Sequence, residues 1–304
     1  MKTPEPISNV QTEKRKFRLY EHPWLSLLIV IVAQTLTLIL VGIVAYISVR
    51  SLSTTPTAQF ITDASSRILT IFIIAPFILR LPKGKRTFRQ YLDDIGLSRI
   101  QPFFRLLLLA FSCYVISALS QVAASLTYRL FEGLPITWNF VRWQIFDLSS
   151  DLPPNSPSLL FSFPSIFEEM LFRGIVLTVF LRKYSERQSI LFSSVGFGLW
   201  HLLSLLFGGD PMWTVGQVIC ASIIGLFYGY VFVRTRSLLP PMIVHYLINV
   251  FISSLSGYMQ SRASIEIQSL YGIILSIGIV PTTLMILWVR FFLSRWMPGD
   301  VNRG

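Results

Sequence analysis

The segment Phe167–Gly174, FEEMLFRG, places three charged side chains inside an apolar stretch of the chain. The residues before it read SPSLLFSFPSI and those after it read IVLTVFL. A charged side chain at the centre of a lipid bilayer costs at least about 2.5–3.5 kcal/mol on insertion scales. Three such charges in one helix must therefore be compensated within the protein, either by pairing with one another or by a chemical role.

The composition of the whole chain explains why this stretch belongs in a bilayer. The 304 residues are 53% hydrophobic and only 13% charged, whereas soluble domains carry roughly 25% charged residues. We therefore expect an integral membrane protein whose surroundings are membrane lipids. The formal charge of +11 comes from basic residues scattered between apolar runs. This pattern is typical of loops that lie against anionic headgroups and does not favour a nucleic-acid groove.

Apolar segments long enough to cross the membrane recur along the chain. A helix needs around 20 residues to span a hydrocarbon layer of about 30 Å. By this measure the sequence predicts an all-α protein with about eight transmembrane helices, at residues 24–49, 60–81, 103–128, 157–181, 189–207, 213–233, 238–256 and 268–293. The loop 81–102 is expected to carry a short amphipathic helix.

The basic residues predict the orientation of these helices. If the N-terminus is cytoplasmic, 20 of the 26 basic residues fall on the cytoplasmic side, five fall on the opposite side and Arg173 is buried. The positive-inside rule predicts such an asymmetry, so both termini are expected in the cytoplasm. In this topology Asp63 and Arg67 lie near the membrane interface, at the start of the second helix. The expected organisation is a polar tail (1–20), three accessory helices with their loops (21–156), four core helices (157–256), and a last helix with a short tail (257–304).

Two charged residues of the fourth helix are spaced to pair with each other. Glu169 and Arg173 are four residues apart and share a helix face, so we expect a structural ion pair. Glu168 is rotated by about 100° from Glu169 and is left to find a proton or another partner. A buried carboxylate of this kind suits a general base.

Two of the three histidines lie inside predicted membrane helices. His245 and Asn249 are four residues apart and share a face, and His201 follows Phe197 by one turn. Together with Glu168, these side chains provide a base, a proton shuttle and hydrogen-bond donors, which are the groups needed to activate water and stabilise an oxyanion. The alternative for each histidine is a structural hydrogen bond between helices.

Three motifs in these helices resemble those of a known family. EEMLFR, starting at Glu168, matches EExxxR; FGLWH, ending at His201, matches FxxxH; and HYLIN, starting at His245, matches HxxxN/D. In order and spacing they resemble the CPBP family, the CAAX-protease and bacteriocin-processing (Abi) intramembrane endopeptidases, which are related to the type II CAAX prenyl endopeptidases. The resemblance covers about residues 160–250.

The resemblance implies a peptidase that hydrolyses a peptide bond in a membrane-associated or C-terminally modified protein, for example a prenylated or membrane-anchored one. It also implies a multi-pass protein of the plasma membrane or an internal membrane, with a cavity open to the cytoplasm. Carried over, Glu168 and His201 activate water, His245 and Asn249 form the oxyanion hole, and Glu169 with Arg173 is structural.

The need for a metal is left open by these motifs. A zinc site would use Glu168, His201 and His245 as ligands, but it would consume the carboxylate that Arg173 leaves unpaired. The chain has no HExxH motif, so we expect a metal-independent glutamate mechanism with no cofactor. A non-catalytic membrane scaffold or immunity-type protein is the alternative function. A proton-coupled transporter is less favoured, because no internal repeat is evident.

Overall fold

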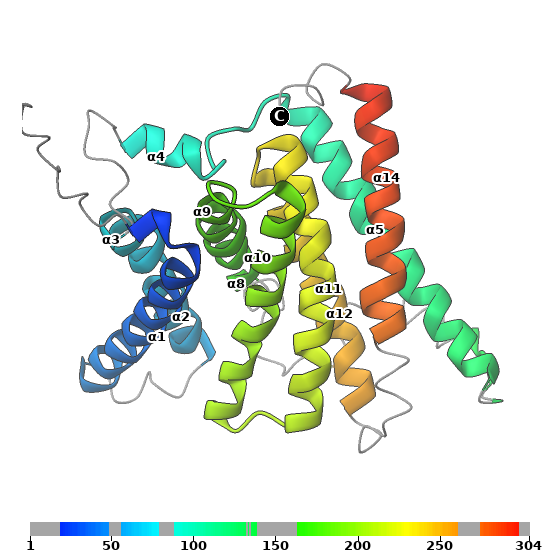
Figure 1. Cartoon of the computed structure of the whole chain (residues 1–304). Coiled ribbons are helices and arrows are strands. Elements are labelled where there is room, and N and C mark those ends of the chain that lie inside the picture. Colours follow the sequence, from blue (N-terminus) through cyan, green and yellow to red (C-terminus); the bar gives the residue numbers. More distant parts are fainter. Residues whose placement is uncertain are drawn as a thin grey trace, which may run out of the picture.

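The computed structural model describes residues 19–48, 56–78, 88–131, 133, 135–138, 163–260 and 274–297. Every regular element in these residues is helical (Figure 1), which confirms the predicted all-α class. The first half of the chain forms η1 (Leu19–Glu21), α1 (Pro23–Ser48), α2 (Pro56–Leu69), η2 (Thr70–Ile74), α3 (Ala75–Ile78), α4 (Phe88–Asp94) and α5 (Phe103–Phe131). The second half forms α8 (Pro164–Glu169), η3 (Met170–Leu177), α9 (Thr178–Phe180), α10 (Glu186–Trp200), η4 (His201–Phe207), α11 (Pro211–Thr235), α12 (Leu239–Gln260), η5 (Ile274–Ile279) and α14 (Val280–Trp296).

Five helices among the described residues are long and apolar enough to cross a membrane. They are Pro23–Ile47, Phe103–Ala124, Glu186–Leu206, Pro211–Thr235 and Ile277–Trp296. The protein is therefore a multi-pass membrane protein. The three other expected spans coincide with the helical stretches 56–78, 164–180 and 239–260, and the total of eight stays a prediction.

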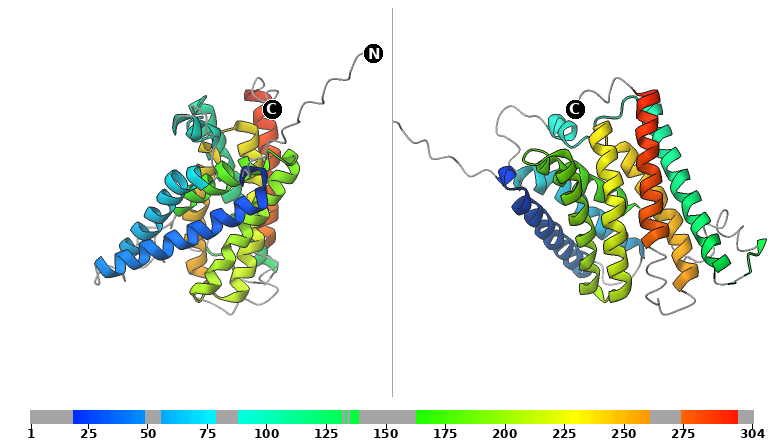
Figure 2. Two further views of the ribbon diagram at one scale, coloured as in Figure 1. Left: turned by 60° about the vertical axis from the view of Figure 1, so that its left-hand side comes forward. Right: turned by 45° about the vertical axis from the view of Figure 1, so that its right-hand side comes forward.

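The helices form a bundle in which α8 to α12 lie between two flanking groups. The hairpin of α1 and α2 packs on one side, and α5 with α14 packs on the other (Figures 1 and 2). One hydrophobic cluster joins α1 and the segment from α8 to α10. A second cluster joins α5, α11, α12 and α14. Charged side chains that lie where these clusters meet are consequently shielded from lipid on both sides.

One end of the bundle, here called the turn end, is formed by the tight turn between α10 and α11. Gly208 adopts a left-handed conformation with φ of 82°, and the side chain of Asp210 caps α11 by accepting from the backbone N–H of Trp213 at 2.7 Å. Pro211 begins the helix, where its missing N–H is harmless. The sequence GGDP therefore reverses the chain within three residues.

The opposite end, here called the basic end, contains α4, the connections 181–185 and 236–238, and the C-terminal end of α14. Hydrogen bonds tie its parts together: Leu238 N–H donates to Gly96 O at 3.1 Å, and Arg105 Nη1 donates to Trp296 O at 3.0 Å. Figure 1 shows α4 and the end of α14 far from the turn between α10 and α11. The short helix expected in loop 81–102 is confirmed as α4, and it docks on the bundle through Tyr91 Oη, which donates to Ile71 O at 2.6 Å.

Candidate active site in the membrane

The predicted ion pair on the fourth membrane segment is present and fully buried. Arg173 Nη1 lies 3.0 Å from Glu169 Oε1, and neither side chain is exposed. Arg173 Nη2 also donates to Gly225 O at 3.3 Å. A Cβ atom at Gly225 would lie 3.0 Å from that nitrogen, so glycine on α11 lets the guanidinium approach the neighbouring backbone.

Two aromatic rings enclose the buried guanidinium. Arg173 Cζ lies 4.4 Å from the ring centroid of Phe197 on α10 and 5.1 Å from that of Tyr228 on α11. A desolvated cation over an aromatic face gains about 2 kcal/mol. Since Phe197 and Tyr228 belong to the two different hydrophobic clusters, the arginine lies where the clusters meet. The guanidinium is therefore buried between protein side chains and does not contact lipid.

Glu168 has a cationic partner that the sequence analysis missed. Its Oε1 accepts from Arg67 Nη1 of α2 at 3.2 Å, and both side chains are 13% exposed. Arg67 Nε in turn donates to both oxygens of Asp63, at 2.9 and 2.8 Å. The sequence analysis placed Arg67 at the membrane interface, but the folded chain brings it into the site. The available signal was an acid and a base four residues apart in a mostly apolar segment.

His245 lies between the two glutamates. Its Nδ1 donates to Glu169 Oε1 at 2.8 Å, because a carboxylate oxygen accepts. The other ring nitrogen, Nε2, is 3.9 Å from Glu168 Oε2. The imidazole stacks on Tyr228 with centroids 4.8 Å apart and an interplanar angle of 23°. Glu169 therefore orients His245 as well as pairing with Arg173.

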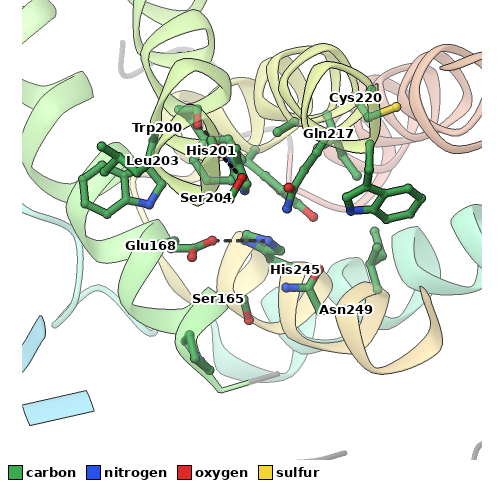
Figure 3. A pocket seen from close by; sticks show the side chains of 18 of the residues that line it. Ser165, Glu168, Trp200, His201, Leu203, Ser204, Gln217, Cys220, His245 and Asn249 are labelled. Atoms are coloured by element: carbon green, nitrogen blue, oxygen red, sulfur yellow. Dashed lines mark hydrogen bonds and ion pairs between the residues drawn. The ribbon is translucent and has the colours of Figure 1, made fainter. Parts of the chain in front are cut away.

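His201 and Asn249 complete the group. His201 begins η4, and its Nδ1 donates to the Phe197 carbonyl at 3.0 Å, which leaves Nε2 as the nitrogen that can accept a proton. Asn249 lies one turn beyond His245 on α12. Figure 3 shows Glu168, His201, His245 and Asn249 facing a single cavity. The tertiary structure thus brings together all four residues that the sequence analysis named as catalytic.

The cavity has a volume of about 480 Å³, within the usual range for ligand sites. Apart from the four polar residues named above, the wall of the cavity is mostly apolar. Its lining residues include Trp200, Leu206, Met212, Trp213 and Ile277. Arg67, Thr35 and Leu38 contribute from α2 and α1. The cavity is therefore an apolar chamber with a small number of polar groups on its wall.

The three residues named as potential zinc ligands do not form a metal site as they lie. No group of three or more His, Cys, Asp or Glu side chains in the described ranges is arranged to hold a metal ion. At Glu168, Arg67 already lies against one carboxylate oxygen. A divalent ion at that oxygen would have to displace a cation.

The fold and the site define a class: a helical membrane protein with a carboxylate and two imidazoles lining a chamber between its helices. Residues 157–251 match the family model of the type II CAAX prenyl endopeptidases, described as Rce1-like. The match confirms the resemblance seen in the three motifs, and it covers a little under a third of the chain. No curated protein and no solved structure matches this chain. The matched segment contains Glu168, His201, His245 and Asn249, whereas Arg67 lies outside it.

Proposed function

We propose that the protein is an intramembrane endopeptidase that hydrolyses a peptide bond in a membrane-associated protein by activating water. One observation carries this proposal: Glu168 Oε2 and His245 Nε2 lie 3.9 Å apart at the cavity that His201 and Asn249 also line. A water molecule in contact with both atoms would be next to a base and next to donors for an oxyanion. The family match of residues 157–251 supports peptidase chemistry.

In the proposed reaction, Glu168 Oε2 accepts a proton from water as the water oxygen attacks the substrate carbonyl carbon. The resulting oxyanion accepts hydrogen bonds from His245 Nε2–H and the Asn249 amide. The C–N bond then breaks, and the proton held by Glu168 passes to the leaving amine nitrogen. His201 Nε2 assists the first transfer by accepting a hydrogen bond from the water. General acid–base catalysis of this kind contributes about 10²–10⁴-fold.

The donor role of His245 needs a proton on each ring nitrogen. Its Nδ1 already donates to Glu169, so donation from Nε2 to an oxyanion requires the imidazolium. The carboxylates of Glu168 and Glu169 on either side of the ring would offset that charge. In this proposal Glu169, held by Arg173, sets the direction in which His245 donates.

The remaining parts of the proposal concern the substrate, the metal and the topology. The substrate is a protein or peptide that reaches the cavity from the lipid, such as a prenylated or membrane-anchored chain. The mechanism needs no metal, because Glu168 Oε2 takes the proton from water directly while Arg67 holds Oε1. The chain crosses the membrane eight times with both termini in the cytoplasm, as the distribution of basic residues predicts.

The test compares Glu168→Gln with Glu186→Gln, a control at a partly exposed surface pair with Arg234. Membrane proteins from cells that express each variant are profiled for newly formed peptide termini. We expect cleavage products in the wild type and in E186Q, and a loss of about 10²-fold or more in E168Q. Cleavage by E168Q at the wild-type rate would refute the role of Glu168.

Two further arms separate the alternatives. Full complementation of a deletion strain by E168Q would favour the scaffold function over the peptidase. Chelator-treated, purified protein should keep its activity, and metal analysis should find less than one zinc per chain. Loss of activity on chelation with recovery on adding zinc would contradict the metal-independent mechanism.

A further inference from the structure

The cavity occupies only one part of the length of the bundle. On α10 the lining residues run from Phe197 toward the turn end, and on α11 they run from Met212 to Tyr228. On α8 the last described lining residue is Glu168, and on α12 the first is His245. On each helix the lining therefore extends from the reactive residues toward the turn end and stops short of the basic end.

The lining residues differ in exposure between the two limits of the cavity. Leu206 and Met212, beside the turn between α10 and α11, are 74% and 38% exposed. At the other limit of the cavity, Phe197 and Tyr228 are 1% and 0% exposed. Behind this floor lie the buried Glu169 and Arg173 and the packed side chains of the core. We therefore take the exposed rim at the turn end as the mouth of the cavity, and the buried floor faces the basic end.

The two ends of the bundle differ in their number of Lys and Arg residues, which is the property that sets orientation in a membrane. The basic end carries Arg182 and Lys183 after α9, Arg187 in the first turn of α10, and Arg234 and Arg236 at the end of α11. The sequence between residues 188 and 233, which includes the turn at 208–210, contains no Lys or Arg. Short loops rich in Lys and Arg stay in the cytoplasm, so the basic end is the cytoplasmic one.

We propose that the cavity opens on the non-cytoplasmic side of the membrane. Two sequence predictions, cytoplasmic termini and a cavity open to the cytoplasm, exclude each other in this structure, because the mouth and the basic residues lie at opposite ends. The charge asymmetry derives from this chain, whereas the cytoplasmic opening was implied only by the family resemblance. We therefore propose the non-cytoplasmic opening in place of the cytoplasmic one that the resemblance implied.

The orientation defines the class of substrate. If the proposed peptidase function holds, on which this step rests, the scissile bond belongs to a segment presented from the non-cytoplasmic face or the outer leaflet. The exposed rim of Leu206 and Met212 and the apolar walls with Trp213 and Ile277 suit an apolar chain that enters from that leaflet. A substrate whose cleavage site stays in the cytoplasm would not reach Glu168.

The chain carries a natural reporter for this proposal. Cys220 lines the cavity, whereas the other cysteine, Cys113, is fully buried on α5. A full-length C113A variant therefore has its single thiol in the cavity. Two side markers are made in the C113A/C220A background: Asp210→Cys at the turn and Arg187→Cys at the basic end, both at exposed positions. The probe is a charged, membrane-impermeant maleimide, added to intact cells and then to permeabilised cells.

We expect the maleimide to label D210C and Cys220 in intact cells, and R187C only after permeabilisation. Labelling of R187C but not D210C in intact cells would overturn the proposed orientation. Labelling of Cys220 only after permeabilisation, with D210C labelled before it, would overturn the proposed opening. Failure to label Cys220 under either condition would also count against a water-connected mouth. Expression and melting temperature of each variant show that it is folded.

These results are independent of catalysis. If E168Q cleaves normally, the proposed function fails while the labelling pattern still places the mouth. If the labelling pattern is reversed and E168Q is inactive, the peptidase function stands and the orientation of the cavity is refuted.

Discussion

Replacing Arg67 by methionine tests the contact that only the tertiary structure revealed. Arg67→Met keeps the length and the apolar stem of the side chain, but it leaves Glu168 without its guanidinium partner. We expect the variant to be destabilised, because a carboxylate that is 13% exposed then loses the guanidinium that is hydrogen-bonded to it. The double variant R67M/E168Q should be more stable than R67M, since the amide carries no charge to compensate.

The expected coupling follows from the geometry of the pair. At 3.2 Å and an effective dielectric constant of about 20, two unit charges attract by about 5 kcal/mol, and desolvation offsets part of this. Measured coupling energies of close charge pairs run from about 1.5 kcal/mol upward. Arg67 also shares its charge with Asp63, and cavity water screens the pair. We therefore expect a coupling free energy of about 2 kcal/mol.

The assay is equilibrium unfolding of the purified protein in mixed detergent micelles, with the wild type, R67M, E168Q and the double variant forming a cycle. The exposed pair of Arg99 and Asp93, at 43% and 49% exposure, provides the matched control through R99M and D93N. Its coupling should be about 0.2–1 kcal/mol, the usual range for surface pairs.

A coupling between Arg67 and Glu168 below about 0.5 kcal/mol would refute the reasoning, because the pair would then behave like a surface contact. Destabilisation of the double variant by the sum of the two single effects would contradict it equally, since independent effects mean that the two side chains do not interact. The activity of R67M provides a separate measurement. A fall in kcat with unchanged KM would indicate that Arg67 positions Glu168, whereas a rise in KM alone would place Arg67 on the substrate.

Three further predictions address orientation, packing and pH. Glu169→Gln should lower cleavage by about 10²-fold or more, because the imidazole that faces it loses its orienting carboxylate; peptide profiling beside the wild type checks this, and an unchanged rate would contradict it. Gly198→Ala should cost about 1–3 kcal/mol in unfolding free energy, since a Cβ there would overlap α11, whereas Gly42→Ala, with open space around it, should not destabilise. Hydrogen bonds from Arg99 lower the pKa of Asp93. The stability from this pair is therefore present above the unfolded pKa of about 3.9 and is lost as the pH falls through the folded value. D93N should melt below the wild type at pH 7, and the difference should shrink as the pH falls below about 3.9; a difference that does not change with pH in the acid range would exclude the ion pair as its source.

Most of the local chemistry of the site could be predicted from spacing along single helices. The pair of Glu169 with Arg173 and the shared face of His245 and Asn249 follow from a separation of four residues, which any helix brings to one side. The choice of Glu168 as the carboxylate that Arg173 leaves unpaired follows in the same way. These inferences needed only helical geometry.

The partners across helices could not be predicted in this way. Arg67 lies 101 residues before Glu168, and His245 lies 76 residues after Glu169. The periodicity of a sequence shows which residues share one face of a helix, but it does not show which faces of different helices pack together. Arg67 was placed at the interface because charges near the start of a span usually lie there, and packing of the α1–α2 hairpin against α8 overrode that expectation.

The sequence by itself determined that this is a membrane protein, because apolar runs long enough to span a bilayer can be read directly from it. It also determined which polar residues form the candidate site, because a charged residue inside such a run is costly and therefore stands out. It also determined which end of each span carries the basic residues. Only the tertiary structure decided which end of the bundle the cavity opens toward and which cation meets Glu168. Both depend on how helices that are distant in sequence pack side by side, and the free energy of that packing comes from contacts that no single helix contains.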